Sequence, residues 1–299
     1  MYKTEDQTRR DWHHLNLKFP ERDELTSGFS CGVDPMDILR DRLERLYHTF
    51  DVSLLSPDPL EAVRRFETPE DQEVAALIAS SLAYGRAEKI VETVEQLFLL
   101  MEGAPYAFVL HFDPQKQADR FRTYVYRFTR GDAIIDLLLI VQAALRRCGS
   151  LQALFLKGYN PQDPHIGSAL TPFVETLLDY SPSLSANGGV RYLLPSPRAG
   201  SACKRLNLFL RWMVRQDEID LGLWRSVSPS RLIIPVDTHI ARLSRLLGLT
   251  ARRQADWKMA EEITTVLRVL DPSDPVKYDL SLCHLGMREA RGQEDSDWS

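Results

Sequence analysis

Apolar side chains recur along most of the chain at the spacing of one face of an α-helix. In the segment 34–50, Ile38, Leu39, Leu43 and Leu46 fall on one side, after an Asp-Pro pair typical of a helix start. The same periodicity, together with one long apolar run at 134–145, predicts further helices. These helices are expected over 69–85, 87–101, 134–145, 165–180, 254–270 and 274–287.

The segment 69–85 differs from the other predicted helices in its composition. Acidic residues occupy its first turn, and a nearly continuous series of apolar and small residues follows until Gly85. This composition predicts a helix that is buried on all sides. Evidence for strands is sparse, because the apolar and β-branched run 232–237 is a single short segment and does not make a sheet. We therefore expect an all-α protein.

Composition and charge add one feature to this picture. The chain has 299 residues, of which 44% are hydrophobic and 26% are charged, and its net charge is −5. The stretch 186–258 holds thirteen Lys or Arg against five acids, a balance of 13 − 5 = +8, so the remainder carries −13. A basic segment on an acidic body is one sign of phosphate binding. A solvated helical surface would have the same composition.

The cysteines and the apolar runs bear on cofactors and location. Cys31, Cys148, Cys203 and Cys283 are far apart, without the spacing of a metal, redox or iron–sulfur site, so no metal or cofactor is expected. The first residues lack the apolar core of a secretory signal, and the run 134–145 is too short to span a bilayer. We expect a cytoplasmic protein without a membrane partner.

Two helix starts carry residues that suggest chemistry. The apolar run 232–236 ends at Asp237, and an amphipathic helix with Arg242 and Arg245 follows. Asp237 suits an N-cap, which alone would explain it, or an active site. At 200–215, Lys204 and Arg205 occupy the first turns of a helix, where cations oppose the helix dipole. Lys204 therefore suggests phosphate binding or catalysis, although most lysines are plain surface residues.

The sequence VDTHIARLSRLLGL, 236–249, resembles the segment that carries the catalytic aspartate in the helix–hairpin–helix DNA glycosylases of the endonuclease III type. The pattern GxxxKxxNxxL, starting at Gly200, is similar to the helix after the hairpin, whose lysine forms a Schiff base in bifunctional members. LIASSLAYGRAEKI, 77–90, is similar to the early helix whose following loop inserts into DNA. The whole pattern also resembles an uncharacterised bacterial family, the domain of unknown function 2400.

This resemblance implies a fold, a partner and a set of site residues. The fold would be two helical lobes with a cleft between them: N-terminal helices 1–69 packing with the C-terminal lobe, a central lobe 70–216, a C-terminal lobe 217–290 and a frayed tail 291–299. The partner would be double-stranded DNA with a damaged base. Lys204 and Asp237 would be catalytic and would meet across the cleft. DNA contacts would come from Gly200, Ser201, Arg205, Arg198, Tyr84, Arg86, Arg242 and Arg245.

The chain also departs from the glycosylase pattern. The family hairpin has two glycines, but here Ala202 stands in place of the second. Two other functions therefore remain open. One is a non-catalytic DNA-binding or lesion-sensing protein on the same fold, and the other is a cleft reused for a ligand other than DNA. A positive rim around the cleft would favour DNA, and a negative rim would favour the last alternative.

Overall fold

The computed structural model describes residues 35–48, 51–181 and 189–286 of the chain. In this part the protein is mostly helical, which confirms the predicted all-α class. The ends of the chain, including the predicted tail 291–299, lie outside the described residues. Within the described residues, no helix combines the length and the apolar composition needed to cross a bilayer.

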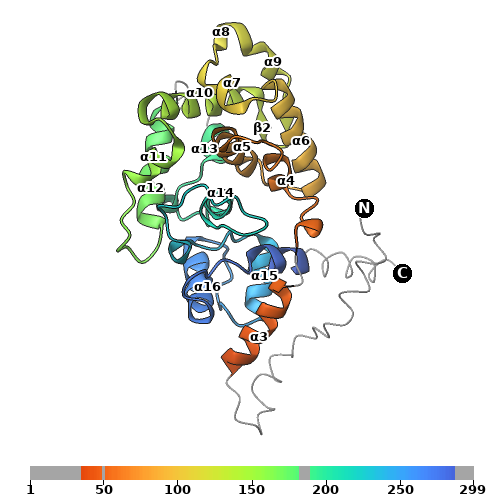
Figure 1. Cartoon of the computed structure of the whole chain (residues 1–299), viewed down its shortest axis with the longest axis vertical. Coiled ribbons are helices and arrows are strands. Elements are labelled where there is room, and N and C mark those ends of the chain that lie inside the picture. Colours follow the sequence, from red (N-terminus) through yellow and green to blue (C-terminus); the bar gives the residue numbers. More distant parts are fainter. Residues whose placement is uncertain (1–34, 49–50, 182–188, 287–299) are drawn as a thin grey trace, which may run out of the picture.

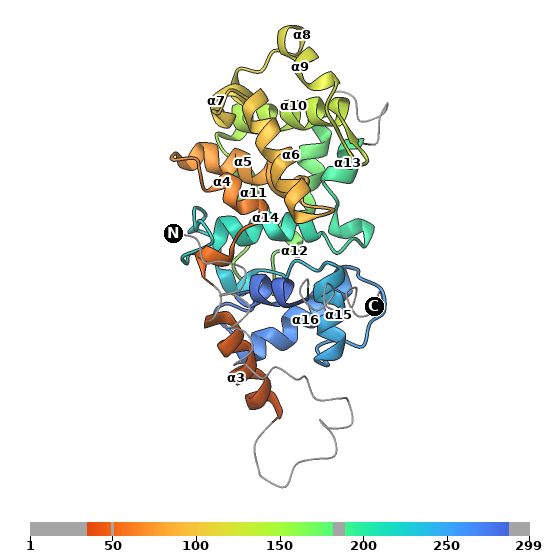
Figure 2. The same ribbon diagram turned by 90° about the vertical axis from the view of Figure 1, so that its right-hand side faces the viewer.

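Helix α14 (Lys204–Val214) runs through the middle of the elongated molecule, with helices on either side of it (Figures 1 and 2). On one side lie α4 (Pro59–Val63), α5 (Pro69–Ser81), α6 (Ala87–Leu100), α7 (Pro105–Leu110), α8 (Pro114–Gln117), α9 (Asp119–Arg122), α10 (Gly131–Cys148), α11 (Leu151–Leu156) and α13 (Gly189–Leu193). Helix α12 (Gly167–Asp179) lies at about the level of α14. On the other side lie α3 (Pro35–His48), α15 (Thr238–Leu246) and α16 (Trp257–Leu270), together with a helical stretch at 279–286.

Helix α5 is the centre of the first group. Its residues from Glu73 to Ser81 are all buried, as its composition predicts, and α14 packs along it. The helix begins at a Thr68 cap, whose hydroxyl accepts a hydrogen bond from the backbone N–H of Asp71. Because α5 and α14 are both largely buried, their packing fixes the position of the residues at the start of α14.

The N-terminal segment contributes to both sides of α14. Helix α3 contacts the C-terminal segment: the Arg40 guanidinium donates to the carbonyl of Leu270 at 3.3 Å, and the Tyr278 hydroxyl donates to Glu44 at 2.6 Å. Helix α4 instead packs on α5 and α6. The segment expected as one N-terminal unit, 1–69, therefore has its described helices in two places.

The structure also contains a hairpin that periodicity did not predict. Strands β1 (Val125–Tyr126) and β2 (Thr129–Arg130) pair antiparallel, and α10 begins at the next residue. The apolar run 232–237 forms no strand. It is a buried extended segment, in which the backbone N–H of Ile234 donates to the hydroxyl of Thr264 at 3.0 Å. Three short 3₁₀ turns complete the described structure: η1 (Val52–Leu54), η2 (Pro197–Ala199) and η3 (Pro229–Arg231).

Candidate functional site

A pocket of about 110 Å³ lies where α14 and α15 begin. Lys204 and Asp237, the first helical residue of α14 and the N-cap residue of α15, both line it. The structure therefore brings together the two residues that the sequence singled out as catalytic. The rest of the lining comes from segments far apart in the chain, namely 57–59, 83–90, 204–211, 235–239 and 279–283.

Lys204 is held at the pocket by the end of α5. Its Nζ donates a hydrogen bond to the carbonyl of Ala83 at 3.1 Å, and its side chain is partly buried. Burial raises the pKa of both Asp58 and Asp279, and the positive charge of Lys204 is one of the effects that oppose this shift. Lys204 is thus a positioned side chain in a polar pocket rather than a freely solvated lysine.

Asp237 caps α15, which confirms the structural part of its prediction. Its Oδ1 accepts hydrogen bonds from the backbone N–H groups of His239 and Ile240, both at 2.9 Å. Its Oδ2 accepts a hydrogen bond from the thiol of Cys283 at 3.6 Å. Burial, reinforced by the nearby acids Asp237 and Asp279, raises the pKa of Cys283 well above its usual range, so the thiol stays protonated and remains a donor. One carboxylate oxygen of Asp237 therefore caps the helix, and the other bonds to Cys283, which also lines the pocket.

A buried ion pair forms the floor of the pocket. The Arg211 Nη1 lies 2.5 Å from Asp279 Oδ2, and the Arg211 Nε lies 3.3 Å from Asp220 Oδ1. Burial raises the pKa of Asp279 to about 6, although the positive charge of Arg211 opposes this shift. Among the described residues, the Arg211 Nη2 has no hydrogen-bond partner. The lining of the pocket therefore includes a buried guanidinium and a buried carboxyl group with a raised pKa.

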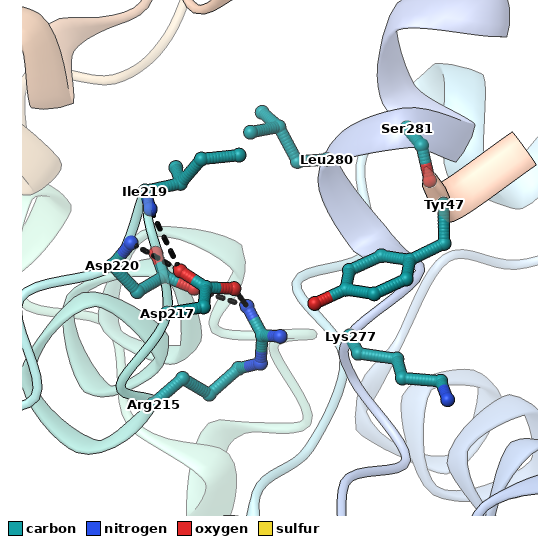
Figure 3. A pocket seen from close by; sticks show the side chains of 8 residues that line it. All are labelled: Tyr47, Arg215, Asp217, Ile219, Asp220, Lys277, Leu280 and Ser281. Atoms are coloured by element: carbon teal, nitrogen blue, oxygen red, sulfur yellow. Dashed lines mark hydrogen bonds and ion pairs between the residues drawn. The ribbon is translucent and has the colours of Figure 1, made fainter. Parts of the chain in front are cut away.

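The same ion network continues along α14 to a second, much smaller cavity (Figure 3). Arg215 pairs there with Asp217 at 2.9 Å, with Asp274 at 2.9 Å and with Asp220. The cavity has a volume of about 10 Å³, which is enough for no more than roughly one water molecule. This network ties the end of α14 to the C-terminal segment and leaves no room for a larger ligand.

The loop before α14 makes structural contacts that the sequence did not predict. Gly200 has a left-handed backbone with φ +77°, and its carbonyl accepts the backbone N–H of Trp257 at 3.2 Å. Ser201 forms a β-bridge with Asp256, and its hydroxyl accepts the N–H of Cys203 at 3.1 Å. The loop is therefore tied to the start of α16, away from the pocket lining.

Arg198 and Arg205 are also engaged within the protein. Arg198 is exposed and pairs with Glu175 at 2.8 Å. The Arg205 guanidinium donates to the carbonyl of Ser81 at 3.2 Å and to that of Tyr192. Burial lowers the pKa of Arg205, against the effect of the neighbouring phenols. Arg205 thus serves as a structural bridge between α5, α13 and α14.

The other predicted DNA contacts differ in their exposure. Tyr84 is half-buried, and its hydroxyl donates to Thr129 Oγ1 at 2.6 Å. Arg86 is exposed at the N-cap of α6. On α15, Arg242 donates to the carbonyl of Gly286 at 3.4 Å and the exposed Arg245 donates to that of Arg253 at 3.4 Å. Arg86 and Arg245 therefore remain exposed, whereas Tyr84 is used to anchor other residues.

Sequence reasoning missed three charged residues of the pocket, Asp58, Arg211 and Asp279. Asp58 stands in an Asp-Pro pair and caps α4 by accepting the N–H of Leu60 at 2.8 Å, which is all that its sequence suggested. Arg211 and Asp279 lie within amphipathic segments, where charged residues usually face solvent. Only their long-range pairing would have identified them. Cys283 also lines the pocket and donates to Asp237.

These observations define a mostly helical protein with a lysine, an arginine and three aspartates in one pocket. A family model described as "Protein of unknown function (DUF2400)" matches residues 58–288, more than half of the chain, so the chain belongs to this family. No curated protein and no solved structure matches the chain. The matched region includes both Lys204 and Asp237, together with every other residue that lines the pocket except Pro57.

Proposed function

We propose that this protein is a DNA-repair glycosylase that removes a damaged or modified base from double-stranded DNA. The proposal includes the finer fold of the sequence prediction, two lobes with a cleft between them as in the helix–hairpin–helix glycosylases. Asp237 is the residue on which base release depends. Lys204 is the residue on which an additional lyase step would depend.

One observation carries this proposal: Lys204 and Asp237 line the same pocket from the starts of two different helices. Their pairing was expected from the glycosylase resemblance before the fold was known. The capping role of Asp237 is compatible with catalysis, because only Oδ1 bonds to the helix.

The chemistry follows from these two groups. Loss of a base breaks the bond between the sugar C1′ and the base nitrogen, and positive charge develops on the sugar. A carboxylate beside the sugar stabilises that charge. Once Lys204 has given up a proton, its Nζ can bond to C1′. A proton then passes from this nitrogen to O4′ as the C1′–O4′ bond breaks, which gives a protonated imine and a free 4′-hydroxyl. Loss of a proton from C2′ then expels the 3′ phosphate, and this β-elimination cleaves the DNA strand. The target nucleotide must leave the base stack to reach the pocket.

Borohydride trapping on duplexes carrying different lesions tests the proposal, because it converts the imine to a stable covalent adduct. The variants are Lys204→Ala and Asp237→Asn, with Lys116→Ala on α8 as the control, since its side chain is 82% exposed. A covalent adduct that Lys204→Ala abolishes and Lys116→Ala preserves supports both steps. Base release without an adduct supports a glycosylase that lacks the lyase step. If the wild type forms no adduct and releases no base on any lesion, the proposal is overturned. Salt-sensitive binding to DNA without either reaction would indicate a DNA-binding protein.

The charge of the pocket favours one alternative, a ligand other than DNA. Asp58, Asp237 and Asp279 line the pocket, against Lys204 and Arg211. Three acids beside two bases form a poor site for phosphate but would suit a small cationic or neutral ligand. Thermal denaturation in the presence of nucleosides and of small diamines separates these cases. Stabilisation by a diamine that Asp279→Asn removes would support this alternative.

A further inference from the structure

An exposed aromatic side chain stands at the turn of the β1–β2 hairpin. Phe128 is 70% exposed, and its ring lies edge-on to that of Tyr192, which is 42% exposed, with 6.1 Å between their centroids. The guanidinium of Arg127 lies 5.7 Å from the centre of the Phe128 ring. Two aromatic rings and a cation thus share one surface, whereas exposed apolar residues usually occur singly.

Tyr84 anchors the hairpin through hydrogen bonds. The Tyr126 hydroxyl donates to the carbonyl of Tyr84, and the Tyr84 hydroxyl lies 2.6 Å from Thr129 Oγ1. The Arg205 guanidinium lies over both Tyr84 and Tyr192, 5.4 and 4.4 Å from their ring centres. These contacts connect β1, β2 and α13, so Phe128 lies on a hairpin that is anchored to its neighbours.

The hairpin also adjoins the pocket. Gly85 lines the pocket, and a Cβ atom placed on it would lie 2.7 Å from the Tyr126 hydroxyl and 3.0 Å from Arg127 Nη1. Only a residue without a side chain permits this approach. The hairpin that carries Phe128 therefore lies next to the pocket lining at Gly85.

The charges around this surface are mostly positive. Arg86 comes from the start of α6, Arg127 and Arg130 come from the hairpin, and Arg191 comes from α13, all of them exposed. Two exposed acids, Glu88 and Asp132, lie in the same segments. This excess of arginine contrasts with the pocket itself, where acids outnumber bases, and it fits a polyanion that passes over the rim.

We propose that Phe128 and Tyr192 form a stacking platform for an unpaired DNA base next to the nucleotide that occupies the pocket. The face of the Phe128 ring takes the base, with the Tyr192 ring packed edge-on to it, and the surrounding arginines contact the phosphates on either side. This inference rests on the proposed function, since it takes the occupant of the pocket to be a DNA nucleotide. It also revises an expectation: Tyr84 supports the platform, and Phe128 is the residue that meets DNA.

Binding of the full-length protein to a fluorescent duplex with one abasic-site analogue tests this inference. The variant is Phe128→Ala, and the control is Val125→Ala, which truncates another side chain of the same hairpin that is 61% exposed. We expect Phe128→Ala to weaken binding about tenfold, a typical loss for one base–aromatic stack. Val125→Ala should retain nearly all the affinity. A 2-aminopurine beside the abasic site should be quenched by wild type and not by Phe128→Ala.

The outcomes separate this inference from the proposed function. Equal affinity and equal quenching for wild type and Phe128→Ala would overturn the platform, even if the protein releases a base. A tenfold loss in Phe128→Ala with no base release by wild type would support the platform and overturn the glycosylase. A wild-type protein that does not bind the duplex would overturn both.

Discussion

Tyr84 and Tyr126 are joined through each other's backbone. The hydroxyl of Tyr126 donates to the carbonyl of Tyr84, and the hydroxyl of Tyr84 lies 3.1 Å from the carbonyl of Tyr126. Their rings are also in contact, with 5.0 Å between centroids. This arrangement attaches the β1–β2 hairpin to the end of α5. Gly85 follows Tyr84 in the chain and lies against the Tyr126 hydroxyl.

Substituting Gly85 with alanine should therefore disturb both the hairpin and the pocket rim. Gly85 has φ +109°, and its new Cβ would approach the Tyr126 hydroxyl within 2.7 Å. We expect a loss of roughly 1–3 kcal/mol in the free energy of unfolding, measured by urea denaturation. Gly103→Ala is the matched control, because Gly103 has φ +70° with open space around it. Equal losses in the two variants would show that the contact with Tyr126 has no energetic weight.

Two substitutions at Asp237 separate its capping role from its charge. Asn keeps an oxygen that can accept from the N–H groups of His239 and Ile240, whereas Ala keeps none. We expect Asp237→Ala to be about 1 kcal/mol less stable than Asp237→Asn in urea denaturation. Both variants should lose base release on whichever lesion the wild type processes. Activity in Asp237→Asn would exclude the carboxylate from catalysis.

The buried carboxyl of Asp279 should make stability depend on pH. Its pKa in the folded chain is raised to about 6, above a value of about 3.9 in the unfolded chain. The folded chain therefore holds this proton more tightly, and the group's contribution to stability is complete below about pH 4 and declines as the pH rises to about 6. Asp279→Asn cannot titrate, so wild type should lose stability relative to this variant between pH 4 and pH 7. A constant difference across that range would contradict the raised pKa.

Removal of the Arg211 charge should be among the most damaging single changes. Arg211→Met fills a similar volume but leaves Asp279 without its buried partner and leaves Asp220 paired with Arg215 alone. We expect a loss of about 3–5 kcal/mol in the free energy of unfolding. Arg122→Ala breaks the exposed pair with Asp119 and should cost at most about 1 kcal/mol. Similar effects of the two variants in chemical denaturation would indicate that the buried network contributes little.

The helical fold could be predicted because the relevant signals are local. Apolar periodicity located α3, α6, α12 and α16, and continuous apolar composition identified the buried α5. The cap at Asp237 was also readable, since an acid before an amphipathic segment meets the first N–H groups of the helix.

The remainder depends on contacts that no short segment of sequence encodes. Strands β1 and β2 have two residues each, which is too short to show alternation, and Phe128 lies in the turn between them. The burial of Arg211 follows from acids that come from elsewhere in the chain. Arg205 had the sequence context of a phosphate ligand, yet its bonds to Ser81 and Tyr192 arise only when α5, α13 and α14 come together.

The dispersed lining of the pocket has a consequence for how the protein is made. Its contributing segments begin at residue 57 and end at residue 283, so a ribosome has released Lys204 well before it has synthesised Asp279 and Cys283. A nascent chain carries the amine without the complete set of acids that surround it in the finished protein. Translation that stops before residue 279 yields a polypeptide without the lining residues Asp279, Leu280 and Cys283, even if the preceding helices have formed.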